Sequence, residues 1–127
     1  MDFNGKYLSL TTFRRDGTPV TTPVWFVADN GSLFVETDGD SYKVKRVRRN
    51  ADVEVAVCTA SGKLRGVKVA AHASILPESE RTRVERLMAR KYRVDRVLIL
   101  PLYRLVQRIR GVAPRGGNPV VLSIIPD

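Results

Sequence analysis

Short segments in which apolar and polar residues alternate run through most of the chain, and this period of two predicts β-strands. In residues 7–13, for example, Leu8 and Leu10 share one face, and Asp16-Gly17 follows as a tight-turn signal. Six strands are predicted in this way, at 7–13, 20–27, 33–37, 52–59, 67–75 and 120–125. Their short spacing favours an antiparallel sheet that curls into a small barrel.

Three segments break this pattern and predict helices instead. Residues 41–50 form the first, with Asp40 or Ser41 as N-cap and Val44 and Val47 on one face. Residues 78–92 form the second, an amphipathic helix with Val84, Leu87 and Met88 inward and Arg81, Arg83, Arg86 and Arg90 outward. The third starts near Pro101 and carries its apolar side chains at Leu102, Leu105, Val106 and Ile109.

Length and charge narrow the class of protein. The chain has 127 residues, 43% of them hydrophobic, which suits a single α+β domain spanning 1–127. Its formal charge of +9 attracts polyanions. The longest apolar run, 97–103, is too short to cross a bilayer, and residues 1–20 lack the apolar stretch of a signal peptide. A single cysteine, Cys58, forms no internal disulfide, so we expect a reducing, cytoplasmic compartment.

Side chains for common catalytic chemistries are scarce. His72 is the only histidine, and it faces away from the valines of its strand, which favours a surface or structural role. One histidine and one cysteine cannot make an ordinary zinc site, so no metal is expected. Cys58 has no histidine nearby in sequence to activate it, and we expect it to pack beside Val57.

The segment 41–49 is the strongest candidate for binding an anion. It carries five basic residues at the start of a helix that directly follows a strand. A helix N-terminus presents unpaired N–H groups and the positive end of the dipole, so a phosphate there would meet Ser41, the first amides and Lys43 together. The alternative is a solvated basic helix, which describes Arg48 and Arg49 equally well.

A second candidate is the segment 21–26. Pro23 cannot donate to a sheet ladder, so its strand lies at an edge or is interrupted, and backbone groups are left for a ligand. A flat heteroaromatic ring could lie there, flanked by Trp25. The alternative is that Trp25 and Phe26 are part of the core.

Together these segments resemble the split-barrel flavin-binding superfamily related to pyridoxamine 5'-phosphate oxidase, and within it the F420-dependent oxidoreductase branch. The resemblance rests on residues 7–13, 16–19, 22–26 and 37–41, on Lys43, Lys45, Arg46 and residues 48–50, and on residues 89–92. It implies a six-stranded antiparallel split β-barrel flanked by short helices. It also implies a homodimer with the cofactor cleft at the subunit interface.

The resemblance further implies where a cofactor binds. The segment like 22–26 lines the isoalloxazine or deazaflavin ring, and the strand end with the following helix start holds the phosphate. The residues implied are Thr22, Pro23, Val24, Trp25, Phe26, Thr37, Ser41 and Lys43. Charge adds Arg46 and Arg49, as partners for a more anionic cofactor.

Coenzyme F420 is favoured over FMN. Its phosphodiester and glutamate tail make better use of the basic residues, and Tyr42 stands where FMN oxidases have an arginine. The activity implied is an F420H2-dependent reductase that passes hydride to an organic acceptor; an FMN oxidoreductase and an F420 carrier are alternatives. Oxidation of pyridoxamine phosphate is not expected, because the basic C-terminal segment of that enzyme is missing. The proton donor is left open among Tyr7, Tyr42, Tyr92 and water.

Two other classes of protein share parts of this pattern. A nucleic-acid-binding barrel would also be basic and carry aromatic residues on its strands, but here the basic cluster lies on a helix. Interfacial membrane binding through 96–110 is a third interpretation, although that apolar stripe suits core packing equally well.

Overall fold

A computed structural model describes residues 3–93 and 119–127. In chain order its elements are β1 (Tyr7–Phe13), β2 (Pro19–Trp25), β3 (Val27–Asp29), β4 (Ser32–Asp38), α1 (Tyr42–Arg49), β5 (Asp52–Cys58), β6 (Val69–Ile75), α2 (Glu78–Lys91) and β7 (Pro119–Pro126). The helix predicted from Pro101 lies outside the described residues. Within them, no helix is both long and apolar enough to span a bilayer.

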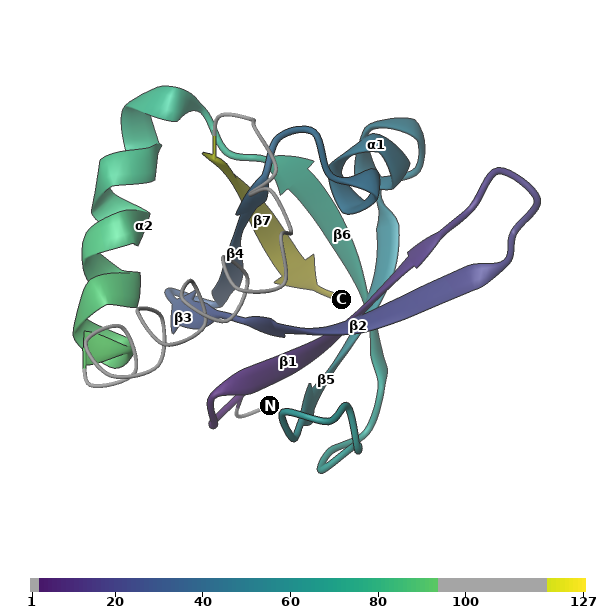
Figure 1. Cartoon of the computed structure of the whole chain (residues 1–127), viewed down its shortest axis with the longest axis horizontal. Helices are drawn as coiled ribbons and strands as arrows, with labels where there is room; N and C mark the ends of the chain where they lie inside the picture. Colours follow the sequence, from purple (N-terminus) through teal and green to yellow (C-terminus); the bar gives the residue numbers. More distant parts are fainter. Residues whose placement is uncertain (1–2, 94–118) are drawn as a thin grey trace, which may run out of the picture.

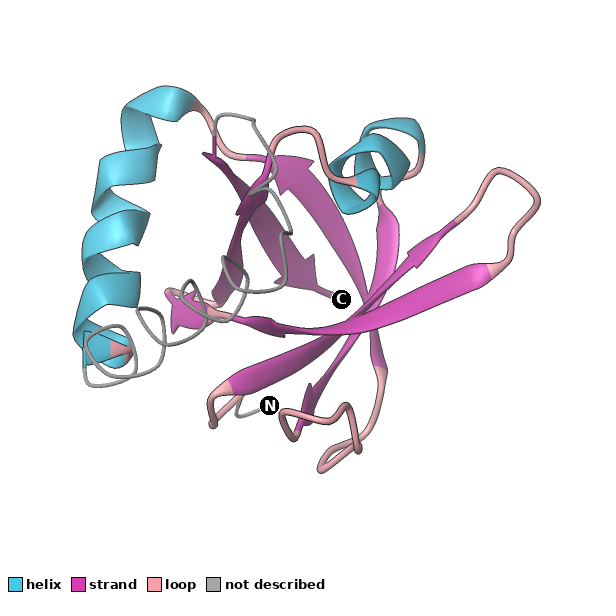
Figure 2. Ribbon diagram, in the orientation of Figure 1, coloured by secondary structure: helices cyan, strands magenta, loops and turns pink. Residues whose placement is uncertain are grey.

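The strands form one antiparallel sheet with the order β2-β1-β5-β6-β7-β4-β3. Figure 1 shows this sheet curling into a half-barrel, and Figure 2 shows the two helices on different sides of it. This confirms the predicted antiparallel split barrel with helices. The strand count differs: the described part of the chain forms seven strands, because the predicted strand 20–27 is divided into β2 and β3 at Phe26.

Side chains from α2 explain the break at Phe26. Its backbone N–H donates to the Tyr92 hydroxyl at 2.9 Å, and its carbonyl accepts from the same hydroxyl at 2.8 Å and from Lys91 Nζ at 2.7 Å. Both backbone groups are satisfied outside the sheet ladder, so the strand can end here without leaving buried polar groups unpaired.

The N-terminal hairpin follows the predicted turn. Thr18 N–H donates to Asp16 Oδ1 at 2.9 Å, and Gly17 has a φ of 89°, which a residue with a side chain adopts only under strain. Among the described strands, β2 is then an edge strand whose one neighbour is β1. An edge tolerates both Pro19 and Pro23, as expected from the missing N–H of proline.

Two apolar clusters hold the fold together. The first fills the half-barrel with the inward residues of its strands, and Val44 and Val47 of α1 are buried in it. The second lies between α2 and the strands β3, β4 and β7, around Val84, Met88 and Tyr92. Leu87 is only partly buried, and β6 starts two residues later than predicted, which leaves Val67 78% exposed.

The surroundings of His72 and Cys58, the two side chains considered for general catalysis, indicate structural roles. Exposed His72 lies 2.8 Å from Asp127 and 3.0 Å from Asp52, confirming its expected role at the surface. Cys58 is buried, and burial raises the pKa of its thiol. A thiol with a raised pKa is a weak nucleophile at neutral pH.

Candidate functional site

The start of α1 is built around the Ser41 side chain. Ser41 has the extended backbone of an N-cap, and its Oγ accepts the Val44 N–H at 3.3 Å and the Thr37 hydroxyl at 3.4 Å. These two bonds tie the end of β4 to the first turn of the helix. The N-cap prediction is therefore confirmed at Ser41.

The hydrogen bonds of Ser41 also decide what this side chain can offer a ligand. A serine hydroxyl has two acceptor lone pairs and one proton, and both lone pairs are in use here. What remains is the proton, which can only be donated. Because the side chain is 95% buried beside the first amides of the helix, the hydroxyl suits an acceptor such as a phosphate oxygen.

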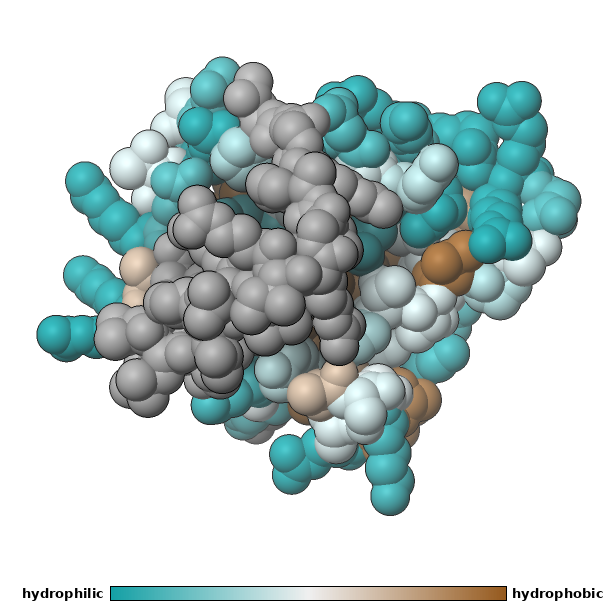
Figure 3. All heavy atoms as spheres, viewed as in Figure 1, coloured by the Kyte–Doolittle hydropathy of each residue, from teal (hydrophilic) through white to brown (hydrophobic). Residues whose placement is uncertain are grey.

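The first turn of α1 contains no acidic residue, and Asp38 and Asp40 lie just before its N-cap. Lys43, in that first turn, is half-buried. Lys45 lies 5.3 Å from the ring centre of Tyr42, which is 64% exposed. Figure 3 shows hydrophilic residues gathered over α1 and the tip of the β1–β2 hairpin. This part of the surface therefore carries more basic than acidic side chains.

Arg46 and Arg49 extend from α1 to the end of β1. Arg46 Nε donates to Thr12 Oγ1 at 2.6 Å, and Arg49 Nη2 donates to the Phe13 carbonyl at 3.1 Å. Burial, and then the charges of Arg14 and Arg49, lower the pKa of Arg46. Three arginines are thus close enough to repel one another, and a bound anion would relieve that repulsion.

Thr12 had not been singled out from the sequence. It follows Leu8 and Leu10 at the same spacing, so it occupies an inward position, and it is 1% exposed. The sequence could have indicated its role, because a polar residue at an inward position has a buried hydroxyl that needs a hydrogen-bond partner. Arg46 supplies that partner from 34 residues away in sequence.

The predicted ring-binding segment runs along the open edge of the sheet. Pro23 is exposed, Thr22, Val24 and Trp25 are half-buried, and all four belong to edge strand β2. Phe26 differs: its side chain is fully buried in the core. Since its backbone N–H and carbonyl are also engaged, the free edge ends at Trp25.

Tyr92 and Lys91 surround the end of this segment and were not assigned to it from the sequence. The Tyr92 ring is stacked on Trp25, with centroids 4.4 Å apart and planes 4° from parallel. Its hydroxyl is fully buried among backbone groups, so it is not placed to give a proton to a substrate. The sequence does indicate that Tyr92 faces the sheet, because Val84, Met88 and Tyr92 are spaced four residues apart along one helix face.

The two predicted parts of the site approach each other through β1. Thr12, the partner of Arg46, pairs with Val20 of β2. Val20 lies two residues, or about 7 Å along a strand, before Thr22. The arginine cluster therefore adjoins the start of the predicted ring-binding edge.

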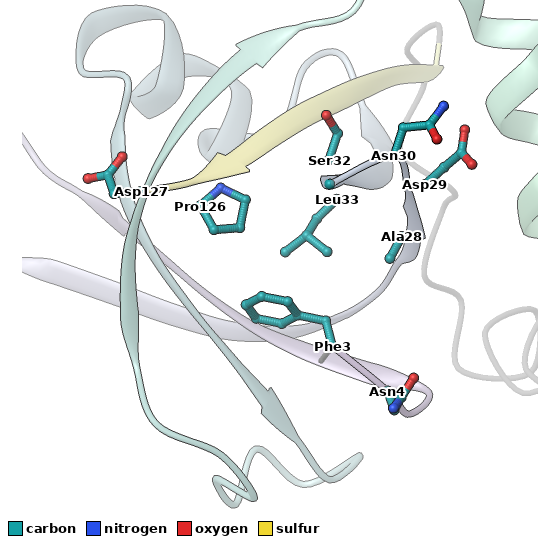
Figure 4. Close-up of a pocket in the computed structure, with 10 residues that line it drawn as sticks. Phe3, Asn4, Ala28, Asp29, Asn30, Ser32, Leu33, Pro126 and Asp127 are labelled. Atoms are coloured by element: carbon teal, nitrogen blue, oxygen red, sulfur yellow. The ribbon is translucent and has the colours of Figure 1, made fainter. Parts of the chain in front are cut away.

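A cavity of about 490 Å³ lies elsewhere in the half-barrel. It is bordered by the turn at 28–33, by Phe3 and Asn4, and by Pro126 and Asp127 (Figure 4). None of the predicted cofactor-binding residues lines it. The candidate site is thus an edge and a helix start, and this cavity is separate from it.

Comparison with known proteins identifies the architecture. The family model described as pyridoxamine 5'-phosphate oxidase matches residues 4–108. A structure from Listeria innocua, named as a candidate pyridoxamine 5'-phosphate oxidase, is 19% identical with a TM-score of 0.64, covering 97% of this chain and 85% of that one. No curated protein matches the sequence.

Two further structures differ in what their names say they bind. One named as an F420 reductase is 19% identical with a TM-score of 0.62, covering 95% of this chain and 86% of that one. An FAD-binding protein from Mesorhizobium loti is 15% identical with a TM-score of 0.62, covering 95% and 81%. At these identities the likeness concerns the fold.

Proposed function

Because the chain belongs to the pyridoxamine 5'-phosphate oxidase family, we propose that it is an F420H2-dependent reductase that passes hydride to an organic acceptor. The observation that supports this proposal is the start of α1, where a buried serine hydroxyl lies beside the first amides of a helix that carries basic residues. A solved structure of the same fold is named as an F420 reductase. The fold and the anion-binding chemistry of this helix start therefore both support a cofactor that carries a phosphate.

The residues present suit the chemical groups of F420. Ser41 and the amides of α1 would hold the phosphodiester, with Lys43 adding charge. Arg46, Arg49 and the neighbouring Arg14 would meet carboxylates of the glutamate tail. Each exposed contact contributes about 0.2–1 kcal/mol, so several must act together. FMN has a single phosphate and would leave most of these cations unused.

The ring would lie along edge strand β2. The deazaflavin supplies two-electron hydride chemistry when bound, so the protein needs no nucleophile of its own. Thr22 to Trp25 would orient the ring through the open backbone edge. A protein that leaves the chemistry to its cofactor needs no reactive side chain. This agrees with the raised thiol pKa of Cys58 and with the contacts of His72 to two aspartates at the surface.

We also propose that the chain acts as a homodimer with the cofactor cleft between subunits. Large apolar side chains are exposed at Leu64, Val67 and Ile125. Ser9, opposite Pro23 on the edge hairpin, has a buried hydroxyl without a hydrogen-bond partner in the described structure. A second subunit would cover the apolar residues and complete the cleft.

The nucleic-acid alternative is less well supported. Single-strand binders stack bases on exposed aromatic rings. Here Phe26 and Phe34 are buried, and Trp25 is stacked on Tyr92. An FMN-binding oxidoreductase stays the second candidate, because a flavin-binding protein shares the fold.

Titration of the purified protein with oxidised F420 and with FMN, followed by fluorescence, tests the proposal. Lys43→Ala should weaken F420 binding about fivefold, as expected for the loss of a charge-assisted contact, with little change in thermal stability. Arg48→Ala is the matched control, because it removes one exposed charge from the same helix.

Three results would overturn the proposal or part of it. No saturable response to either compound would exclude the cofactor role. Tighter binding of FMN than of F420 would favour the second candidate. Equal losses in Lys43→Ala and Arg48→Ala would leave only a general attraction between the basic helix and any anion.

A further inference from the structure

The junction between β2 and β3 is anchored by Tyr92, the C-cap residue that follows α2. Tyr92 is fully buried, and its hydroxyl contacts the N–H and carbonyl of Phe26 and the carbonyl of Lys6, the last at 2.6 Å. One hydroxyl therefore joins α2 to the end of edge strand β2 and to the segment just before β1. Lys6 and Phe26 are far from Tyr92 in sequence.

The ring of Tyr92 acts on Trp25 at the same junction. The two rings are stacked with nearly parallel planes, so one face of the indole is covered by protein. Trp25 is the last residue of the predicted ring-binding edge, and it remains half-exposed. The stack covers one face only, which leaves the opposite face of the indole outside it.

Lys91 also contacts Phe26, the residue between β2 and β3. Its Nζ donates to the Phe26 carbonyl and lies 3.6 Å from the centre of the Phe26 ring. Both α2 residues thus bind a single backbone unit. This concentration of contacts exceeds what is needed to dock a helix, because α2 already buries Val84 and Met88 against the sheet.

We propose that Tyr92 is a positioning residue for the ligand ring: it fixes the plane of Trp25 and the end of the open edge before the ligand binds. The inference rests on the proposed function, because it assigns the same edge to a flat tricyclic ring. Its physical basis is preorganisation, since a side chain that is already ordered loses little entropy on binding. Tyr92 itself does not touch the ligand.

Two variants separate the parts of this role. Tyr92→Phe keeps the ring but removes the hydroxyl, and Tyr92→Leu removes the stacking partner as well. Val84→Ala is the control, because it weakens the same apolar cluster two turns earlier on α2. A purely structural role for Tyr92 would make all three variants less stable and leave ligand affinity of the folded protein unchanged.

Trp25 is the only tryptophan in the chain, so tryptophan fluorescence, excited where tyrosine does not absorb, reports on this position alone. Quenching of Trp25 by acrylamide in the ligand-free protein should increase in Tyr92→Leu and stay at the wild-type level in Val84→Ala. The dissociation constants of F420 and FMN should rise in both Tyr92 variants, about fivefold for Tyr92→Phe, from loss of one ordered hydrogen-bonded anchor.

The outcomes distinguish a failure of the proposed function from a failure of the inference alone. If wild-type protein binds neither F420 nor FMN, the proposed function fails, and the ligand-positioning inference fails with it, whatever the quenching shows. If wild-type protein binds ligand but both Tyr92 variants bind it with unchanged affinity, only the inference is overturned. Unchanged quenching in Tyr92→Leu would overturn the claim that the phenol ring covers Trp25.

Discussion

Replacing Ser41 by aspartate and by asparagine separates the two roles assigned to this residue. All three side chains are strong N-caps, because each presents an oxygen to the amides of the first turn. Aspartate adds a negative charge at the position where the phosphate is expected, whereas asparagine has nearly the same size without the charge. A difference between the two variants therefore reports on electrostatics.

The structure allows the size of this effect to be worked out. Ser41 Oγ is 3.3 Å from the Val44 nitrogen, so a phosphate bound at the same amides would have its charge about 4 Å from the new carboxylate. At an effective dielectric constant of about 20, two unit charges at that distance repel by roughly 4 kcal/mol. Salt and partial solvent access reduce this to about 1.5 kcal/mol, or about tenfold in Kd.

The stability of the free protein should follow a different order. Asparagine and aspartate should both keep the cap, and aspartate also gains about 0.5 kcal/mol from the helix dipole. Ser41→Ala should lose about 1 kcal/mol of unfolding free energy, which corresponds to about 4 °C in Tm. Urea denaturation gives the free energies, and fluorescence titration with F420 gives the Kd values.

The result that would refute the reasoning is equal F420 affinity in Ser41→Asp and Ser41→Asn with both variants folded. In that case no anion binds at the start of α1. The basic residues of the helix would then be a solvated face, as the alternative interpretation of the sequence holds.

Two other predictions concern Lys91 and the oligomeric state. Burial lowers the pKa of Lys91 to about 8. Between pH 8 and 10.5 the unfolded chain therefore binds more protons than the folded one. The unfolding free energy of wild type, compared with that of Lys91→Gln, should rise over this range by about 1 kcal/mol, a value reduced to allow for solvent contact. Urea denaturation measures this difference, and a difference that does not change with pH would contradict the prediction. Sedimentation equilibrium of the wild type should give the mass of a dimer. Val67→Asp should lower the measured mass toward that of the monomer. A monomeric wild type would refute the homodimer.

Much of the fold was accessible from local patterns in the sequence. The hairpin turn at Asp16-Gly17 depends on a contact across two residues, and the N-cap at Ser41 on one across three. The alternation in β1 and β5 depends only on which face of a strand is buried. The boundaries of these elements agreed with the structure to within a residue or two, because the interactions that end them lie nearby in the chain.

The candidate site was accessible only in part. Ser41, Lys43 and the edge strand with Pro23 were identified by the chemistry that their positions allow. Thr12 was missed because its partner Arg46 is 34 residues away. Tyr92 was considered only as a proton donor, because its bond to Phe26 spans 66 residues. No periodicity within a short window contains those pairs.

By itself, the sequence determined the class of fold, the positive charge and the start of the basic helix, because propensity, turns and capping act over a few residues. Only the tertiary structure decided that strand 20–27 divides at Phe26, that Phe26 is core while Trp25 stays half-exposed, and that Arg46 and Arg49 extend to the end of β1. Each of these three features depends on the position that a side chain distant in sequence takes in the folded sheet. A buried polar group takes the partner that the folded chain brings to it.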